Sequence, residues 1–560
     1  MATDLLSIPQ DLLLRILAEL DAGSLIRCGM TCKSMHETVK STPSLQYALL
    51  LHLEGLRDTR TSTSPGYHEL IEQLVRRRRE RMLLRPNVLK RDSIELPGGH
   101  ERHALVGNVF ANLNQRHELD IVWLPTPDNL EEVKVQRIAQ SINTRFFAMD
   151  PGQDMIALVE EPEEPVSSTD AYIIRIHIRT ISTDTVHPLA KESPLVFSIF
   201  YTEFWSHFFL ESTLSVAQTS LALHTQKEWK VKRLLIWDWR TSDLLLDSSL
   251  SLDPSLSDNR AFRLLTADLF VLTDVQGSGS IRLYKLVYPD VIDTSPSTPT
   301  HLATFHLPQT VPGCRTEYVH INAGPIAAHP LPFPGTSHNT PPPYLLNDDD
   351  HVHRFILAYH HEIIGVERVL SKYYDFEMYV HQRVFARYYR FRYSEQVGVV
   401  APVDVPWAEW GPANTRIVQA PYGQLAWTGD IRGQCVVAPM PSAAIDSNVS
   451  GNISSAVEIL DFSLAAIMSL SSSPQSQSQS PLEPWSDFAV LCAPSRIKAA
   501  SDVTPYQEDV ETYLPCVSSK LNIQHRHSAY KITEDSVIGV NTASHRHGLS
   551  VVLSIYPIDS

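Results

Sequence analysis

The chain has 560 residues and six cysteines; 43% of its residues are hydrophobic, 20% are charged, and its formal net charge is −16. This balance is typical of folded globular domains and excludes a largely disordered chain. The negative charge argues against general binding of nucleic acid or anionic lipid, because proteins bind both by neutralising phosphates with Lys and Arg.

The sequence also predicts the compartment. The cysteines are scattered and form no pair of CxxC units, so we expect reduced thiols rather than a disulfide scaffold. Residues 1–4 lack the basic region of a secretory signal. No apolar stretch reaches the roughly 18–20 residues that span a bilayer; the best candidate, residues 197–217, contains Glu203, His207 and Glu211. We therefore expect a protein of the cytoplasm, the nucleus or both, with no membrane partner.

The first predicted elements are short helices. Pro9 suits a first helical turn, where its missing N–H would have no partner. An apolar stripe at helical spacing follows it, formed by Leu12, Leu13, Ile16, Leu17 and Leu20. Residues 21–24 break this helix and can cap a second one over 25–30; a third is predicted over 32–39, and a further element begins at Thr42-Pro43. Three short helices within about forty residues bury little area, so we expect them to complete their packing on a partner.

The order of these residues resembles the F-box family over roughly residues 5–50. The segments that carry the likeness are Ile8-Pro9, Leu12-Leu13, Ile16-Leu17, Leu20-Asp21, Ser24-Leu25, Cys32-Lys33 and Thr42-Pro43-Ser44-Leu45. The family often has Trp where this chain has Met35 and Gln46. The resemblance implies docking of the small adaptor that links F-box proteins to a cullin scaffold. The residues implied to bind that adaptor are Ile8, Pro9, Leu12, Ile16, Leu25 and Met35. The alternative is an ordinary helical bundle without a partner.

A helical linker is predicted over residues 51–94. Within it, residues 69–91 have the pattern of one more helix, and Pro86 is expected to end that helix. The linker contains a basic stretch that includes the run Arg76–Arg79. Such a cluster can act as a nuclear import signal, but it is more commonly a solvated helix face.

From residue 95 to residue 560 the pattern becomes strand-like, with short β-branched and aromatic runs between turn signals and almost no convincing helix. Successive groups of strands begin about fifty to sixty residues apart, which is the size of a four-stranded propeller blade. We therefore predict an α+β multidomain chain, in which a small helical F-box precedes a mostly-β domain, a β-propeller of about seven blades. A pair of two-sheet sandwiches is the alternative.

Particular segments support this architecture. Residues 237–242, Trp-Asp-Trp-Arg-Thr-Ser, resemble the end of a WD-type blade, where a buried strand leaves through a tight turn. Gly277-Ser278-Gly279-Ser280 is predicted to form a hairpin turn between two strands. Residues 150–154, 237–239 and 405–416 resemble segments of a large group of fungal F-box proteins.

Four low-complexity stretches are predicted to form surface loops, because their serine, proline and acidic residues cannot build a packed core. They cover residues 160–170, 295–300, 340–350 and 471–480. The Ser-Pro steps near these loops are possible phosphorylation sites.

Signals for catalysis or metal binding are weak. There is no Walker-type loop and no GxSxG elbow. His351, His353 and the His360-His361 pair suggest a metal site, but such a site needs at least three converging ligands, and no spacing here completes the set. Exposed strand positions explain the C-terminal histidines His525, His527, His545 and His547.

Trp407 and Trp410 are predicted to be packing anchors rather than a platform for a ligand, because large aromatic side chains bury the most area. We predict no catalytic, metal-binding or cofactor-binding residue, and no cofactor.

These features predict the substrate-recognition subunit of an SCF-type cullin–RING ubiquitin ligase. The F-box would bind the adaptor, and through it a cullin, while the β domain would hold an unidentified protein substrate near the conjugating enzyme. The alternatives are an adaptor-bound scaffold outside the ligase and a propeller enzyme with an incidental helical N-terminus. Recovery of the adaptor without a cullin would favour the scaffold; carboxylates clustered at the central channel would favour the enzyme.

Overall fold

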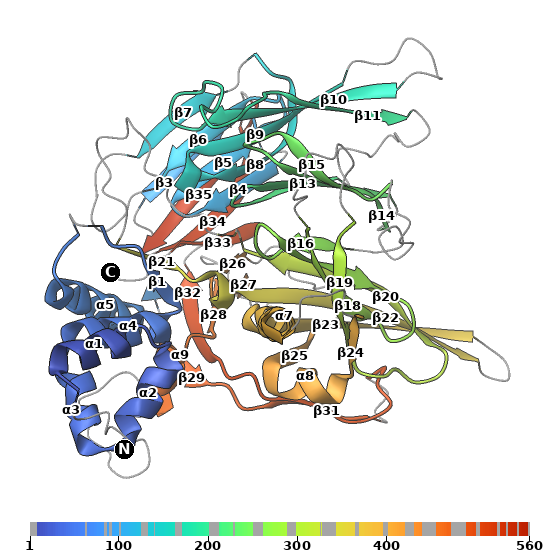
Figure 1. Cartoon of the computed structure of the whole chain (residues 1–560). Helices are drawn as coiled ribbons and strands as arrows, with labels where there is room; N and C mark the ends of the chain where they lie inside the picture. Colours follow the sequence, from blue (N-terminus) through green and yellow to red (C-terminus); the bar gives the residue numbers. More distant parts are fainter. Residues whose placement is uncertain are drawn as a thin grey trace.

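A helical lobe lies beside a larger β domain in the computed structural model of the chain (Figure 1). The structure describes residues 8–61, 64–82, 87–88, 92–99, 102–124, 133–138, 141–162, 171–200, 212–227, 230–249, 261–287, 298–324, 326, 343–364, 369–395, 401–420, 430–439, 455–471, 489–499, 504–523, 527–533, 536–545 and 548–557.

The helical lobe begins with α1 (Gln10–Ala18), α2 (Ala22–Thr31), α3 (Lys33–Ser41) and α4 (Pro43–Glu54). Asp21 caps α2, since its carboxylate accepts a hydrogen bond from Ser24 N at 2.9 Å. Gly55 ends α4 with a φ of +66°, a conformation that glycine adopts without strain. These helices confirm the predicted elements. They enclose a small core of Leu13, Leu17, Leu25, Met35, Val39 and Leu45.

The linker contributes β1 (Leu56–Asp58) and α5 (Tyr67–Met82). The predicted helix over residues 69–91 therefore begins two residues earlier than expected. The prediction is wrong at residues 87–88, which form a short strand, and the predicted end at Pro86 lies outside the described residues.

In the described residues, seven sheets follow, each built on four antiparallel strands. The first has β4 (Arg102–Val106), β5 (Val109–Leu113), β6 (Leu119–Trp123) and β7 (Lys134–Ile138); the second has β8 (Thr144–Asp150), β9 (Met155–Glu160), β10 (Ala171–Thr180) and β11 (Leu195–Phe200). The third has β12 (Thr213–Ala217), β13 (Ser220–Lys227), β14 (Lys230–Asp238) and β15 (Asp243–Asp247); the fourth has β16 (Phe262–Leu264), β17 (Leu269–Asp274), β18 (Ser280–Lys285) and β19 (Thr300–His306), extended by β24 (Val403–Val405).

The fifth sheet has β20 (Cys314–Ala323), β22 (Val352–Ile364), β23 (Val369–His381) and β25 (Thr415–Ala420). The sixth has β26 (Asp430–Arg432), β27 (Cys435–Pro439), β28 (Ser455–Asp461) and β32 (Val517–Ile523), with β2 (Asn87–Val88) and β29 (Ala489–Leu491) added to β32. The seventh has β33 (Ala529–Ile532), β34 (Ser536–His545), β35 (Gly548–Pro557) and β3 (Asp92–Pro97). Two-stranded sheets join β1 to β21 (Tyr344–Leu346) and β30 (Ser495–Ile497) to β31 (Val510–Thr512).

The seven sheets form a closed ring. Each sheet has one edge strand that contacts the corresponding edge strand of the next sheet. From the first sheet to the seventh, these edge strands are β4, β8, β12, β16, β20, β26 and β33. A separate hydrophobic core fills each of the seven spaces between neighbouring sheets. Each sheet therefore buries both faces on two neighbours, as propeller blades do. This arrangement confirms the predicted propeller of about seven blades and excludes the pair of sandwiches, in which each sheet has one partner.

Strand β3 closes the ring. It precedes every strand of the first sheet in the sequence, yet it pairs with β35 in the seventh sheet, where Leu96 lies opposite Val551. Leu96 and Val551 also belong to the core between the seventh and first sheets, together with Phe110 of the first. Closure covers the edge of β35, which would otherwise offer unpaired backbone groups to other chains. Apart from the two-residue strand β2, the strands of the ring thus begin at Asp92.

The expectation of almost no helix after residue 95 is wrong. The β domain contains α7 (Arg383–Glu395), α8 (Trp407–Asn414) and α9 (Leu464–Ser471). In α7 the apolar side is largely aromatic, a composition that local propensity assigns to strands. Packing of Val384 and Phe385 into the core of the fourth and fifth sheets stabilises the helix.

Two predicted turns are confirmed. Asp238 ends β14, and its Oδ1 accepts hydrogen bonds from Arg240 N at 2.9 Å and Thr241 N at 3.2 Å, which turns the chain into β15. Gly277 and Gly279 have φ values of +60° and +88° in the hairpin between β17 and β18.

Candidate functional site

Helix α1 carries apolar side chains on two sides. Leu13 and Leu17 point into the core of the lobe, whereas Leu12 is 49% exposed and Ile16 is 43% exposed. Leu12 and Ile16 are four residues apart, so they lie one above the other on the outer side of the helix. An outer apolar pair of this kind contributes nothing to the core of the lobe.

Helix α2 has the same arrangement. Leu25 is buried, while Ile26 is 43% exposed and Met30 is 80% exposed at the same spacing of four residues. The sequence analysis did not select Ile26 and Met30. Their spacing, offset by one from the buried Leu25 and Gly29, is the signal that could have identified them. Clustered exposed apolar side chains mark surfaces that bind other proteins.

The six residues selected from the sequence separate into two groups. Pro9, Leu12 and Ile16 are exposed and Ile8 is partly exposed. Leu25 and Met35 are only 1% and 4% exposed and belong to the core of the lobe. An adaptor can therefore contact the first group directly, whereas Leu25 and Met35 can act only by holding the helices in position.

A two-stranded sheet and a short 3-10 helix join the lobe to the ring. Strand β1 pairs with β21, with Leu56 opposite Leu346, and Asn347 N donates to Gly55 O at 2.9 Å. Residues 340–350 were predicted to be a surface loop. In the described part of that segment, 343–350, the prediction is wrong, because pairing with β1 orders β21 and a 3-10 helix follows at Asp348–Asp350.

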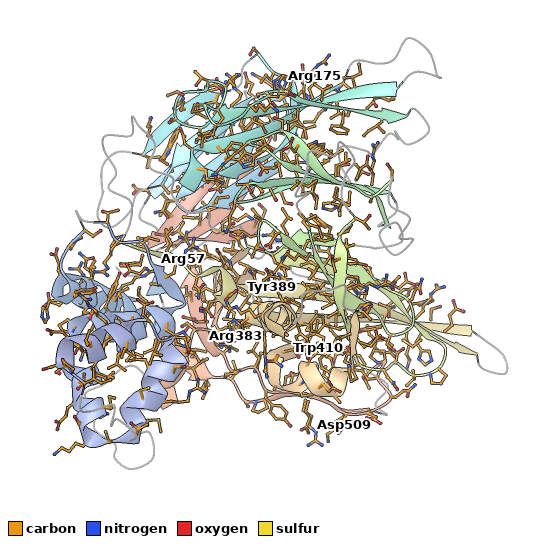
Figure 2. The ribbon with its side chains drawn as sticks, viewed as in Figure 1. Arg57, Arg175, Arg383, Tyr389, Trp410 and Asp509 are labelled. Carbon is orange, nitrogen blue, oxygen red and sulfur yellow. The ribbon has the colours of Figure 1, made fainter. Side chains whose placement is uncertain are left out.

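Polar contacts also connect the lobe to the ring at this junction. Arg57 pairs with Asp348 at 3.1 Å, and Gln218 Nε2 of the third sheet donates to the same carboxylate oxygen at 3.3 Å. Burial lowers the pKa of Arg57, and the charge of Asp348 opposes that shift. Figure 2 shows Arg57 between the lobe and the ring. An apolar cluster surrounds these contacts; its buried members are Tyr47, Leu51, Leu56, Leu70 and Leu74, with Tyr344 and Leu346 of β21 packed against them.

The basic stretch takes part in the same junction. Arg78 Nε lies 2.6 Å from Glu54 Oε1, and the carboxylate of Glu54 is almost fully buried. Arg77 lies over the ring of Tyr344 at 5.6 Å. These contacts give part of the arginine run a structural role. Its use in nuclear import stays a prediction.

The histidines singled out in the sequence are mostly buried. His351, His353 and His360 have almost no exposed surface. His353 Nε2 donates to Gln382 Oε1 at 3.0 Å, and burial lowers the pKa of His353 to about 3 and that of His351 to about 4. Across the described residues, no three His, Cys, Asp or Glu side chains gather as ligands of one metal ion.

His527 corrects the prediction of exposed C-terminal histidines. It is buried, and its Nε2 lies 2.8 Å from the hydroxyl of Tyr556. The other C-terminal histidines do not test the prediction: His525 and His547 lie outside the described residues, as does the side chain of His545. All six cysteines are free thiols.

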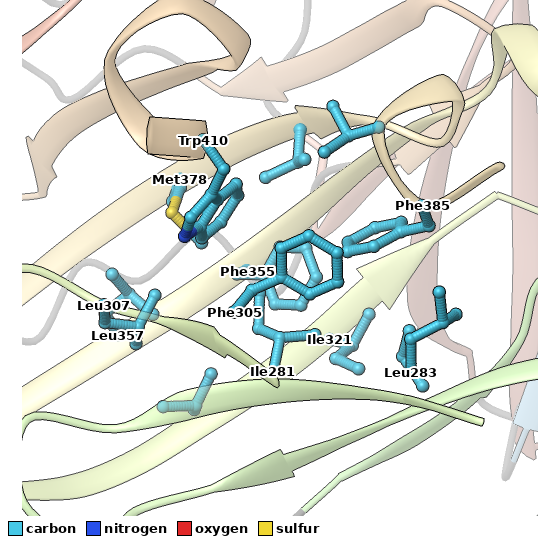
Figure 3. Packing of buried hydrophobic residues seen from close by; sticks show 14 of the residues in the cluster. Ile281, Leu283, Phe305, Leu307, Ile321, Phe355, Leu357, Met378, Phe385 and Trp410 are labelled. Atoms are coloured by element: carbon cyan, nitrogen blue, oxygen red, sulfur yellow. The ribbon is translucent and has the colours of Figure 1, made fainter. Parts of the chain in front are cut away.

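Trp410 is a packing anchor, as predicted. Its side chain is 1% exposed, and its indole N–H donates to His306 O at 2.9 Å. In Figure 3 the ring of Phe305 lies between those of Trp410 and Phe385, with centroid distances of 5.4 and 5.3 Å. Trp407 contacts Trp410 edge-on at 5.3 Å from the partly buried side of the same core.

Comparison with known proteins identifies the helical lobe. Residues 5–47 match the F-box domain family. No curated protein matches the chain. Among solved structures, Sqt1 from Chaetomium thermophilum matches with 10% identity over 81% of each chain, at a TM-score of 0.26. The ring is established by its own strand pairing and inter-sheet cores, not by this likeness. In the described residues, no helix has the length and apolarity needed to cross a membrane.

Proposed function

We propose that this F-box protein, with its seven-bladed propeller, is the substrate-recognition subunit of an SCF-type cullin–RING ubiquitin ligase. The single observation that carries the proposal is the outer apolar pair of α1, Leu12 and Ile16, within the segment that matches the F-box family. Such a pair lowers its free energy by burial on another polypeptide, at about 25 cal/mol for each Å² removed from water.

The adaptor would dock on the outer side of the lobe. Leu12 and Ile16 would contribute buried apolar area, and Ile8 and Pro9 would extend the contact toward the N-terminal end of α1. Through the adaptor the chain would join a cullin scaffold. Leu25 and Met35 would contribute by fixing the angle between the helices rather than by contact.

The propeller would hold a target protein on a face of the ring, where the loops between strands converge. The contacts at this junction favour this role, because the pairing of β1 and the partly buried Arg57–Asp348 ion pair fix the ring relative to the adaptor. A fixed arrangement raises the effective concentration of a target lysine near the conjugating enzyme. The chain itself would supply no catalytic residue, and it would act in the cytoplasm, the nucleus or both.

The direct test is adaptor capture by the full chain. The double variant Ile8→Asp with Pro9→Ala should lose capture of the purified adaptor, while the thermal unfolding of the β domain stays unchanged. Retained capture would show that these residues do not bind the adaptor. Capture of the adaptor from cells without any cullin would favour a scaffold outside the ligase instead.

A further inference from the structure

A hollow of about 610 Å³ opens beside α7. Three arginines of this helix line it, together with Asp349 from the 3-10 helix at the junction, the amide of Asn414 and two small apolar side chains of α7. The hollow therefore lies next to the segment that joins the lobe to the ring. Its lining residues are far from the F-box helices in the sequence.

The three arginines form a stripe. Arg383, Arg387 and Arg390 follow the i, i+4, i+7 spacing that places side chains on one side of a helix, and all three are exposed. Phe385, on the opposite side, packs into the core of the fourth and fifth sheets. Figure 2 shows Arg383 at α7.

Two of these guanidinium groups have free donors. Arg390 pairs with Asp349. The guanidinium groups of Arg383 and Arg387 make no hydrogen bond or ion pair with another described residue. The charge of Arg383 nevertheless reaches the partly buried carboxyl of Asp350 and opposes the rise in pKa that burial causes there. Arg383 and Arg387 can each still form two parallel hydrogen bonds to an anion.

Helix stability does not account for this stripe. Like charges four residues apart destabilise a helix by a few tenths of a kcal/mol. Arg383 is also the first residue of α7, where the helix dipole disfavours positive charge. An anion bound between the arginines would offset both the repulsion between like charges and the unfavourable interaction with the helix dipole.

We propose that this hollow binds an acidic segment of the target protein, whose phosphate or carboxylate groups pair with Arg383 and Arg387. The inference rests on the proposed function, because it names the part of the target that is recognised. The stripe runs about 10 Å along the helix axis, which is the span of about three residues of an extended peptide. Spaced anionic groups on one peptide fit that length. A long polyanion such as nucleic acid is disfavoured by the net charge of −16.

Degenerate peptide pools test the site on the full-length chain. One immobilised pool carries fixed phosphoserines, a second carries glutamate at the same positions and a third carries serine. The wild type should be retained on the phosphoserine pool or the glutamate pool far above the serine pool, and the stronger of the two identifies the anionic group. The variant Arg383→Ala with Arg387→Ala should reduce that retention at least about tenfold, the effect of losing one charge-assisted hydrogen bond.

Arg315→Ala is the matched control, because Arg315 is an exposed arginine of β20 in the fifth sheet and lies outside the hollow. It should bind the peptides as the wild type does. Equal retention on all three pools, or equal retention of the double variant and the wild type, would overturn the inference. Adaptor capture, measured in parallel, separates the two proposals: peptide binding without adaptor capture contradicts only the ligase function, and the reverse contradicts only the acidic-segment site.

Discussion

The double variant Leu12→Ala with Ile16→Ala should weaken adaptor binding without unfolding the lobe. Fully burying a Leu or Ile side chain stabilises by about 1.5–3 kcal/mol. Leu12 and Ile16 are 49% and 43% exposed, so docking can bury about half of each. The pair then contributes about 1.5–3 kcal/mol to binding, and its loss should raise the Kd about 10- to 100-fold.

The assay is calorimetric titration of the purified full-length chain with the adaptor, accompanied by hydrogen exchange of the α1 amides. Exchange should stay close to that of the wild type, because both positions face outward and Ala favours helix. Leu17→Ala gives the opposite pattern. Leu17 is buried in the core of the lobe, and its truncation should cost the lobe about 2–5 kcal/mol and speed amide exchange.

Val75→Ala is the matched control for this experiment. Val75 is 48% exposed on α5, outside the segment that matches the F-box family. Its variant should bind the adaptor with wild-type affinity. The reasoning is refuted if the double variant binds as tightly as the wild type, or if Val75→Ala weakens binding as much.

Further changes test the packing, the junction and the response to acid. Trp410→Ala should lower the free energy of unfolding by about 3–5 kcal/mol in urea titrations, because it opens the core around Phe305; a loss below about 1 kcal/mol would contradict the anchor. Arg57→Ala should leave Asp348 short of a partner, cost about 1–3 kcal/mol and speed proteolysis between α5 and the ring, whereas an unchanged cleavage rate would show that the junction holds without this pair. Acid should destabilise the β domain, because burial lowers the pKa of five histidines from 6.5 to about 3 or 4. The unfolded chain therefore binds protons before the folded chain does as the pH falls below about 6.5, and the loss of folding stability is at most about 2 kcal/mol for each histidine at pH 5. A thermal midpoint equal at pH 7.5 and pH 5 would contradict this expectation. These histidines are His224, His320, His351, His353 and His381.

Local patterns in the sequence determined the elements of this protein. The leucine stripe after Pro9 predicted α1, the capping residues of 21–24 predicted a second helix, and the recurring strand groups predicted a ring of about seven blades. These features depend on residues close together in the chain, whose spacing alone decides which side of a helix or strand is apolar. The turn after Asp238 is local in the same way, because one carboxylate caps the two amides that follow it.

Contacts between distant segments decided the rest. Strand β3 belongs to the last blade only because closing the ring brings it beside β35. The acidic segment around Asp348 is ordered because β1, nearly three hundred residues earlier, pairs with β21. Leu12 and Leu25 are both apolar residues of the helical lobe, yet one is exposed and the other is buried. Helical spacing identifies an apolar side, but only the packing of one element on another determines which apolar side is covered.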